Sequence, residues 1–327
     1  MSVIVPTYNR ADLLPHLLGA LAGQIYPSHL LELIIVDNSS RDQTPELVAA
    51  WSKVMGFPVR FIQKENQGPT ASRNLGASQA RGEILAFTDS DCLAGARWVL
   101  NAVSHLQAHP EVSIVCGPMR ALRGEGEGLL EGQYEETTRD TGLYPSGNLF
   151  FRRECFERTG GFDEQFGIYP WGALVRGEDT DLVWRARRIG YRAEFVEGVA
   201  VGHLPGPAPG MPAFLLQPLV VQIFPRLLRS VPELRETFLW RRYFVGRDHA
   251  LFYLACAGGL DAARRRSLPS LLLVLPWLWE IRGLLRNEYR RGGLPAAAGS
   301  AALLAQHLAA CAVVLVYASL RYRRLVL

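Results

Sequence analysis

Apolar runs of four or five residues alternate with amphipathic stretches along the first ninety residues. Four runs have the length and composition of buried strands, at 2–5, 33–36, 59–62 and 83–87. Between the first two runs, leucines recur at helical spacing from Leu13 to Leu21, so a helix is expected there. Strands that are apolar almost throughout and alternate with helices predict an α/β fold with a mostly parallel sheet and flanking helices.

The alternation continues to about residue 203. Further helices are expected from Thr44 and at 71–80, 97–107, 153–158 and 178–189, and further strands at 112–116, 148–151, 194–196 and 199–201. The stretch 205–212 is rich in proline and glycine, which is typical of a domain boundary. We therefore expect an α/β domain at 1–204, a linker at 205–212 and a basic, apolar, α-helical region at 213–327.

Composition limits the class of protein. Of 327 residues, 49% are hydrophobic, which allows a sizeable core and excludes global disorder. The five cysteines lie far apart and form no C-x-x-C pair, so a reducing compartment fits better than a disulfide framework or zinc site. The first ten residues have the pattern of a strand and loop rather than of a signal peptide, so the α/β half is expected in the cytoplasm.

Charge is divided unevenly along the chain. Up to His203 there are 19 Lys and Arg against 25 Asp and Glu, whereas from Leu204 on there are 16 arginines against 6 acidic residues. A basic, apolar C-terminal third favours an anionic partner, either a membrane surface or a nucleic acid. The use of arginine rather than lysine for these basic residues is also compatible with the nucleotide base composition of the gene alone.

One apolar stretch of the C-terminal region, 296–320, is long enough to cross a bilayer, whereas 268–279 is too short. Arginines flank the longer stretch on both sides, so charge gives no clear orientation. We expect interfacial helices with at most one span, and a soluble helical subdomain or dimer interface is the alternative.

Two aspartates follow the fourth predicted strand, in the sequence Asp89-Ser90-Asp91. In open α/β sheets, ligands bind at this carboxyl edge. Two carboxylates so close repel each other unless a cation joins them, and a divalent cation bound here could hold a diphosphate. The alternative is an Asp-rich turn with capping aspartates. The loop after the first strand, Pro6–Arg10, is not glycine-rich, which argues against a dinucleotide-binding Rossmann domain and a P-loop.

Six motifs occur in a fixed order. They are VIVPTYNR at 3–10, IVDNSS at 35–40, GPTASRNLG at 68–76, Asp89-Ser90-Asp91, GFDE at 161–164 and GEDTDLVWR at 177–185. Together they resemble the family 2 glycosyltransferases of the GT-A fold over about residues 1–203. The resemblance implies a Rossmann-like GT-A domain that transfers a sugar from a nucleotide-diphosphate donor with inversion at the anomeric carbon.

The resemblance also implies roles for residues at the donor site. Asp91 is expected to bind a divalent metal, Mg²⁺ or Mn²⁺, while Asp89 contacts the ribose or the metal shell. His203 either completes the metal site or is structural. The remaining donor-binding candidates lie in the first three motifs and are Pro6, Thr7, Asn9, Asp37 and Arg73. The alternatives are a helix cap for Asp37 and a surface ion pair for Arg73.

The last motif, at 177–185, is expected to contribute the residues that contact the acceptor. Asp179 is expected to be the general base, because it resembles the family's Glu-Asp pair near the acceptor hydroxyl, with Glu178 beside it. A capping role at the helix N-terminus is compatible with this. Arg185 either contacts the diphosphate or pairs with Asp181 four residues earlier. Trp171 either forms an acceptor wall or packs in the core.

We therefore expect a metal-dependent inverting glycosyltransferase at the cytoplasmic face of the membrane, peripheral or single-span. Its partners would be a nucleotide-diphosphate sugar, a glycan or lipid-linked acceptor and the membrane surface, with no nucleic acid. One alternative is a processive polysaccharide synthase, although the sequence lacks several clear spans. The other is a non-catalytic nucleotide-sugar binding protein, against which the retained Asp89, Asp91 and Asp179 argue.

Overall fold

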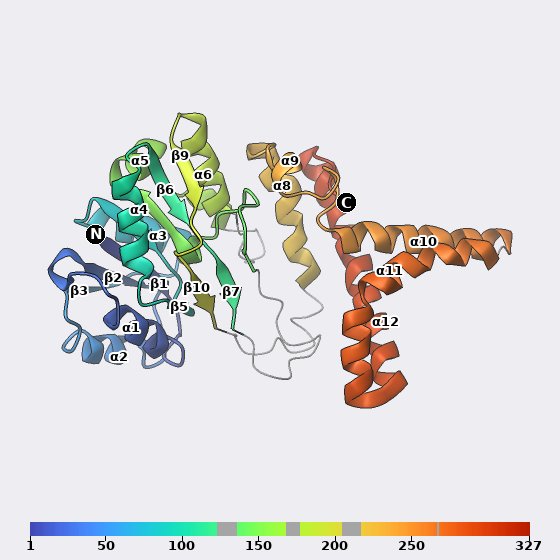
Figure 1. The fold of residues 1–327 in the computed structure, drawn as a ribbon, viewed down its shortest axis with the longest axis horizontal. Coiled ribbons are helices and arrows are strands. Elements are labelled where there is room, and N and C mark those ends of the chain that lie inside the picture. Colours follow the sequence, from blue (N-terminus) through green and yellow to red (C-terminus); the bar gives the residue numbers. More distant parts are fainter. Residues whose placement is uncertain (123–135, 168–176, 205–216, 267) are drawn as a thin grey trace. The chain divides into compact units, whose positions relative to one another are not determined.

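The computed structural model describes residues 1–122, 136–167, 177–204, 217–266 and 268–327 (Figure 1). The chain forms two compact units, one of residues 1–124 and 134–206 and the other including residues 207–327. The first unit is an α/β domain built on a large sheet. The described residues of the second unit are mainly helical.

A seven-stranded sheet forms the centre of the first unit. Its strands are β1 (Ser2–Thr7), β2 (Glu32–Asp37), β3 (Val59–Gln63), β4 (Ile84–Phe87), β6 (Val112–Cys116), β8 (Leu149–Arg152) and β9 (Arg192–Phe195), in the order β3-β2-β1-β4-β8-β6-β9. All neighbours are parallel except β8, which is antiparallel to both β4 and β6. The expected α/β fold with a mostly parallel sheet is therefore confirmed, while the reversed direction of β8 was not predicted.

Helices cover both faces of this sheet. They are α1 (Leu14–Ala22), α2 (Thr44–Trp51), α3 (Gly68–Gln79), α4 (Trp98–Ala108), α5 (Arg153–Thr159) and α6 (Glu178–Arg188). Side chains of successive residues point to opposite faces of a strand, so Val3 and Val5 pack in one core with α1 and α4. On the other face, α3 lies so close to β1 that a Cβ at Gly76 would stand 2.5 Å from Ile4 Cγ2. Both faces of β1 are thus buried, as its apolar sequence predicts.

A second, smaller sheet was not predicted. It contains β5 (Cys92–Ala94), β10 (Val201–His203) and β7 (Met119–Ala121), in that order. In the antiparallel pairing of β5 with β10, His203 lies opposite Cys92. This small sheet therefore brings the end of the α/β domain beside the turn that follows β4.

The described residues of the second unit form two long helices, α10 (Arg247–Arg265) and α12 (Arg282–Tyr322), and several short helical segments. The short segments are η4 (Gln217–Gln222), α8 (Ile223–Ser230), α9 (Leu234–Thr237), η5 (Leu268–Val274) and α11 (Leu275–Glu280). A break with non-helical backbone divides α12 at Gly292 and Gly293, where Gly293 has a φ of 69°. Within the described part of the chain, α12 is the one helix long and apolar enough to cross a membrane, judged by length and composition.

Candidate active site

The turn after β4 places Asp89 and Asp91 at the carboxyl edge of the large sheet. Its backbone is fixed by a hydrogen bond of 3.1 Å from the Cys92 N–H to the Asp89 carbonyl, and Cys92 itself is fully buried in β5. On the inner side, a Cβ at Gly147 would lie 3.3 Å from Asp89 Oδ2. The turn is therefore held between the small sheet and the segment that leads into β8.

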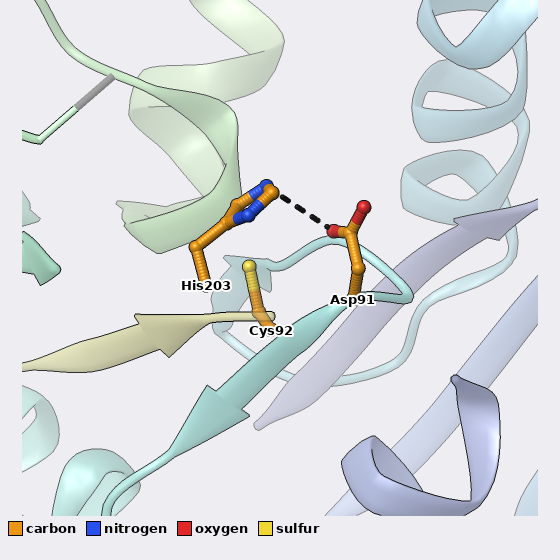
Figure 2. Close-up of side chains that lie close together, drawn as sticks. All are labelled: Asp91, Cys92 and His203. Carbon is orange, nitrogen blue, oxygen red and sulfur yellow. Dashed lines mark ion pairs between the residues drawn. The ribbon is translucent and has the colours of Figure 1, made fainter. Parts of the chain in front are cut away.

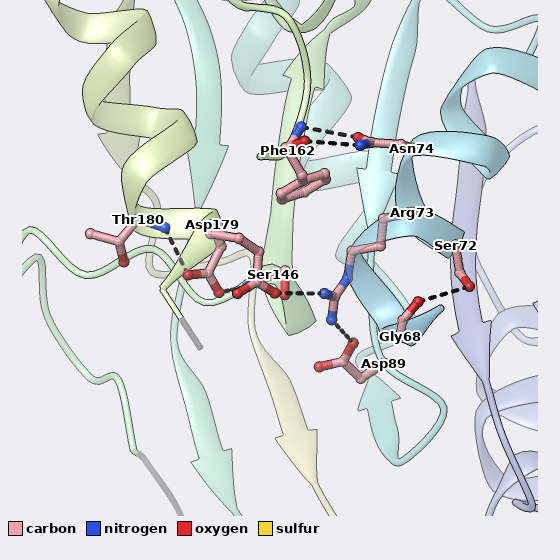
Figure 3. A network of polar contacts seen from close by, with 10 residues as sticks. Gly68, Ser72, Arg73, Asn74, Asp89, Ser146, Phe162, Asp179 and Thr180 are labelled. Carbon is pink, nitrogen blue, oxygen red and sulfur yellow. Dashed lines mark hydrogen bonds and ion pairs between the residues drawn. The ribbon is translucent and has the colours of Figure 1, made fainter. Parts of the chain in front are cut away.

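A buried arginine joins this turn to the start of α6. Arg73, in the second turn of α3, contacts Asp89 Oδ1 with Nη2 at 2.6 Å and Glu178 Oε1 with Nη1 at 3.0 Å (Figure 3). Burial lowers the pKa of Arg73, but the charges of Asp89 and Glu178 outweigh it and the pKa lies above its usual value. The ion pair offered as the alternative for Arg73 is present, and it is buried rather than at the surface.

Glu178 and Asp179 open α6, directly after Gly177, whose φ of 110° is in the left-handed region. Burial and the negative charge of Asp179 raise the pKa of Glu178 to about 7, while Arg73 opposes that rise. Glu178 Oε2 is buried and, within the described residues, makes no hydrogen bond. One oxygen of Glu178 is thus held by Arg73, and the other has unused capacity to accept a hydrogen bond.

The Asp179 carboxylate is oriented by backbone donors. Asp179 Oδ2 accepts a hydrogen bond of 2.9 Å from the Ser146 N–H, and Oδ1 accepts one of 2.7 Å from the Thr180 N–H (Figure 3). Burial raises the pKa of Asp179, and these two N–H groups work against the rise. The reversed direction of β8 is essential here, because it brings the preceding residue Ser146 to the same sheet edge as the end of β4.

Asp91 lies beside side chains that could act as metal ligands, and beside Arg10. Its Oδ1 is 3.5 Å from His203 Nε2 (Figure 2). Its Oδ2 is 3.8 Å from Arg10 Nη2. One ligand atom each from Asp91, Cys92 and His203 lie within 4.8 Å of one another. Burial and the charge of Asp89 raise the pKa of Asp91, with His203 and Arg10 opposing it. Among the residues described, Asp91 Oδ1 is buried without a hydrogen bond.

The possible metal-ligand atoms of this site fit a hard divalent cation. Carboxylate oxygens suit Mg²⁺ and Mn²⁺, and the imidazole of His203 extends the site for Mn²⁺. Burial raises the pKa of the Cys92 thiol well above its usual value, and neutral sulfur is a poor ligand for either ion. Asp91 and His203 are therefore the better ligands, and Cys92 packs beside them.

The expected donor pocket lies at the ends of β1 and β2. Asp37 is fully buried and accepts hydrogen bonds from the Ser40 N–H at 3.1 Å, from the Ser40 hydroxyl and from Gln63 Nε2. Asn9, in a left-handed backbone with φ of 50°, accepts a 2.8 Å hydrogen bond from the Arg41 N–H. The alternative of a helix cap for Asp37 does not apply to α2, because that helix begins seven residues later, at Thr44.

The other two donor candidates belong to β1 itself. Pro6 pairs with Val36 and Thr7 with Asp37 in the parallel ladder between β1 and β2. Thr7 Oγ1 is buried and makes no hydrogen bond to any residue that the structure describes. A hydroxyl with free bonding capacity at the carboxyl end of a central strand is suited to contact a ligand.

One of the described sequence candidates lies apart from this cluster. Arg185 pairs with Asp181 at 2.7 Å, as its spacing predicts, and donates to the carbonyls of Thr159 and Gly161 at 2.5 and 2.7 Å. These contacts fasten α6 to the end of α5. Trp171 falls outside the described residues.

Several residues at the site were missed by sequence reasoning. Arg10 reaches Asp91, Ser146 holds Asp179, and Asn74 bonds the backbone of Phe162 at 2.9 and 3.0 Å. Asn148 is fully buried, accepts from Trp98 Nε1 at 2.8 Å and donates to two carbonyls. Arg10 and Asn74 belong to motifs already noted, whereas only the short polar run before the 148–151 strand could have indicated Ser146.

The fold is that of the GT-A class of glycosyltransferases. Residues 2–163 match the family described as Glycosyl transferase family 2, and the chain belongs to this family. The match ends before Glu178, Asp179 and His203 and does not cover those three residues.

Solved structures agree on the fold. The mannosyltransferase PcManGT from Pyrobaculum calidifontis, in complex with GDP-Man and Mn²⁺, has a TM-score of 0.65 at 23% identity, over 95% of this chain and 85% of that chain. Residues 1–349 of Staphylococcus aureus TarS, in complex with UDP-GlcNAc, have a TM-score of 0.55 at 19% identity, over 99% and 92% of the two chains. At these identities the likeness concerns the fold alone.

In sequence comparison, two relatives are 30% identical to this chain over part of its length. Glycosyltransferase AglE from Haloferax volcanii is 30% identical over 210 residues, which cover 62% of this chain and 66% of AglE. The poly(ribitol-phosphate) β-N-acetylglucosaminyltransferase TarS from Staphylococcus aureus is 30% identical over 149 residues, covering 46% of this chain. The chain matches only 26% of the length of TarS.

Proposed function

We propose that this chain is a metal-dependent, inverting glycosyltransferase that transfers a sugar from a nucleotide-diphosphate donor to a lipid-linked or membrane-proximal acceptor. The observation that carries the proposal is the continuous set of contacts from Asp89 through Arg73 to Glu178, with Asp179 next in the chain. It puts a carboxylate turn suited to a cation and an acidic pair suited to proton transfer into one site. Family membership supports sugar transfer as the reaction.

Asp91 and His203, with Asp89 beside them, would hold Mg²⁺ or Mn²⁺. The fit rests on the orphaned, buried Asp91 Oδ1 and its position 3.5 Å from His203 Nε2. When bound, the ion would neutralise negative charge on the diphosphate. Likeness to PcManGT, whose complex contains Mn²⁺, is in keeping with this.

The donor nucleotide would lie across the ends of β1 and β2. Asp37 supplies a buried carboxylate that can accept a hydrogen bond from a base N–H, and Thr7 supplies a hydroxyl without a present partner among the described residues. Pro6 and Asn9 would form the floor beneath the nucleotide. The bases of GDP and UDP both carry a ring N–H, so Asp37 alone does not select between them.

Asp179 is the proposed general base. In the reaction, a bond forms between the acceptor hydroxyl oxygen and the anomeric carbon while the bond from that carbon to the diphosphate breaks, and the hydroxyl proton passes to Asp179. A single displacement of this kind inverts the anomeric configuration. The Ser146 and Thr180 N–H groups fix the direction of the carboxylate, which a base must have before reaction.

Glu178 is the proposed acceptor contact beside the base. Its free Oε2 can accept a hydrogen bond from an acceptor hydroxyl while Arg73 holds Oε1. Trp171 remains the proposed acceptor wall. For Arg185, the three contacts within α5 and α6 support the structural alternative over a contact with the diphosphate.

Membrane association is proposed for the second unit, at the cytoplasmic face of the membrane. Large apolar side chains stand exposed on η5, α11 and α12, among them Leu268 at 77%, Trp279 at 66% and Leu320 at 76%. Arg282 lies 4.4 Å from the centre of the Trp279 ring, a pairing of basic and aromatic groups suited to an anionic interface. Attachment could be peripheral or through α12 alone.

The proposal is tested by incubating the full chain with UDP-GlcNAc or GDP-Man, Mn²⁺ and a membrane extract, and by following nucleotide release and glycan formation. We expect release that depends on Mn²⁺ and a product whose anomeric configuration is opposite to that of the donor. Asp179→Asn should keep nucleotide affinity and lose about 10²-fold or more in turnover, while the exposed matched control Asp12→Asn retains it. Equal losses of binding and turnover would make Asp179 a donor-site or structural residue, and wild-type turnover would move the base elsewhere.

A further inference from the structure

Arg73 forms ion pairs with two separate parts of the site. One is the turn after β4, through Asp89, and the other is the start of α6, through Glu178. We propose that Arg73 is a positioning residue, which fixes the base-bearing end of α6 relative to the carboxylate turn, so that nucleotide binding at the turn and proton transfer at α6 are coupled. This inference rests on the proposed function of the site.

The position of Arg73 in α3 is itself fixed on both sides. The Ser72 hydroxyl donates to Asn38 Oδ1 at 2.9 Å. Asn74 exchanges two hydrogen bonds with the Phe162 backbone (Figure 3). Phe162 in turn lies under the guanidinium, with its ring centre 5.9 Å from Arg73 Cζ. The part of α3 that carries Arg73 is therefore held on both sides, and the Phe162 ring packs against the guanidinium.

The chemistry of guanidinium explains why arginine is needed for such a bridge. It is planar and presents separate N–H groups, so Nη1 and Nη2 can bond two carboxylates at once. A lysine ammonium carries the same charge at one point and would hold one carboxylate less firmly than the other. With a side chain only 5% exposed, Arg73 also shields Asp89 and Glu178 from each other in a region of low dielectric.

A donor-binding role for Arg73 would require the guanidinium to face the nucleotide. Instead both of its terminal nitrogens are engaged by carboxylates, at 2.6 and 3.0 Å, and the side chain is buried. A ligand that binds Asp89 would therefore change the contact of Asp89 with Arg73, and through Arg73 it would affect Glu178. By linkage, an acceptor bound at Glu178 would then change nucleotide affinity by the same factor as bound nucleotide changes acceptor affinity.

The test is a double-mutant cycle in the full chain with Arg73→Lys, Glu178→Gln and their combination. Mn²⁺-dependent binding of UDP and of GDP is measured by calorimetry, and turnover is measured at saturating donor. We expect Arg73→Lys to change nucleotide affinity by less than about 5-fold and to lower turnover by about 10- to 100-fold. The combined variant should be no more than about 3-fold slower than the slower single variant, because both changes break one bridge.

Two results would overturn the proposal. If Arg73→Lys weakens nucleotide binding strongly while turnover at saturating donor is unchanged, Arg73 binds donor. If the two losses multiply in the combined variant, Arg73 does not act through Glu178. Thermal unfolding of each variant separates these results from loss of folding, and Arg73→Gln serves as a second variant if Arg73→Lys is unstable.

The binding measurements also separate this inference from the proposed function. A wild-type chain that binds Mn²⁺ with UDP or GDP but turns over neither donor would refute sugar transfer from those donors. In that case, nucleotide affinity alone still tests whether Arg73 couples Asp89 to Glu178. Glu178→Gln should change nucleotide affinity at least about 3-fold when Arg73 is present and have no effect in the Arg73→Lys background, and equal effects in both backgrounds would refute it.

Discussion

Four acidic side chains converge near one buried guanidinium. Asp89 and Glu178 contact Arg73 directly, and Asp179 and Asp91 follow one or two residues along the chain. Burial makes ionisation costly, and the positive charges of Arg73 and Arg10 do not balance four carboxylates, which is why the pKa values of Asp91, Glu178 and Asp179 are all raised. Such an imbalance is typical of a site that binds a cation.

Removing one carboxylate should therefore weaken metal binding without harming the fold. For Asp91→Ala we expect Mn²⁺-dependent affinity for UDP or GDP to fall by about 10²-fold or more, because the ion loses a charged ligand and the remaining contacts are weaker. Calorimetry with and without Mn²⁺ measures the loss, and thermal unfolding in EDTA checks the fold. Unchanged affinity in the presence of Mn²⁺ would contradict the assignment of Asp91 as a metal ligand.

The raised pKa of Glu178 predicts how stability depends on pH. Between its usual value of 4.5 and about 7, the unfolded chain has lost this proton while the folded chain keeps it. The free energy of unfolding should therefore fall as the pH rises through this window, by at most about 3 kcal/mol, and level off above pH 7. Denaturant unfolding in EDTA from pH 4.5 to 8 measures this slope.

Glu178→Gln should remove that slope, since glutamine does not titrate. The matched control is Glu157→Gln in α5, where the glutamate side chain is 62% exposed and its removal should leave the pH dependence as in the wild type. A wild-type curve parallel to that of Glu178→Gln would show that Glu178 titrates near its ordinary pKa in the folded chain.

At the scale of elements, the position of α3 determines the site, because Arg73 and Asn74 both depend on it. The helix approaches β1 so closely that a Cβ at Gly76 would lie 2.5 Å from Ile4 Cγ2 and 3.3 Å from Val36 Cγ2. Glycine at 76 is therefore needed for space and not for backbone conformation. A helix pushed outward here would carry the guanidinium of Arg73 away from Asp89.

Gly76→Ala tests this packing. We expect it to destabilise the fold by about 1–3 kcal/mol through overpacking and to lower turnover as Arg73 shifts. Gly19→Ala is the matched control, a glycine inside α1 whose added Cβ would meet only Trp51 at 3.8 Å, and it should stabilise by about 0.5–1 kcal/mol. Denaturant unfolding measures both, and equal effects of the two substitutions would contradict the tight contact of α3 with β1.

The apolar runs predicted most of the large sheet, because strands buried on both faces are readable without knowing their partners. Val112–Cys116 has the predicted bounds, and β1 to β4 lie within a few residues of theirs. The antiparallel direction of β8 could not be predicted, because an apolar run does not indicate in which direction the strand will pair in the sheet. The small sheet was missed as a unit since β5, β7 and β10 have three residues each, too few to show a period.

The same distinction applies to the site. Motifs with neighbouring acidic residues identified Asp89, Asp91, Glu178 and Asp179 as candidates, since residues that are close in the sequence can be recognised without a structure. The contact between Arg73 and Glu178 joins residues 105 positions apart, and no local pattern records which carboxylate a buried arginine will meet. The hydrogen bond from Ser146 to Asp179 uses a backbone N–H, which any residue supplies and no sequence pattern shows.

At the scale of the whole molecule, the two units have opposite character. The α/β unit buries its apolar residues in a continuous core, whereas α12 leaves Val313 71% and Leu320 76% exposed. Exposed apolar surface of this extent beside many arginines fits a membrane interface better than bulk water. Within the described residues, α12 is the one helix that is long and apolar enough, by length and composition, to cross a membrane.

Truncation after Gly210 tests the role of the second unit. Because the C-terminal Leu327 pairs with Val245 and Tyr243, removal of α12 alone would disturb the rest of that unit, and removal of the whole unit is the cleaner change. We expect residues 1–210 to remain folded around the large sheet, to bind Mn²⁺ with UDP or GDP, and to stay in the supernatant when membranes are sedimented. The full chain should sediment with vesicles that contain anionic lipid and less with neutral ones, since arginines are attracted to anionic headgroups. Sedimentation of the truncated chain to the same extent would show that the second unit is not the anchor, and failure to fold would show that it belongs to the core.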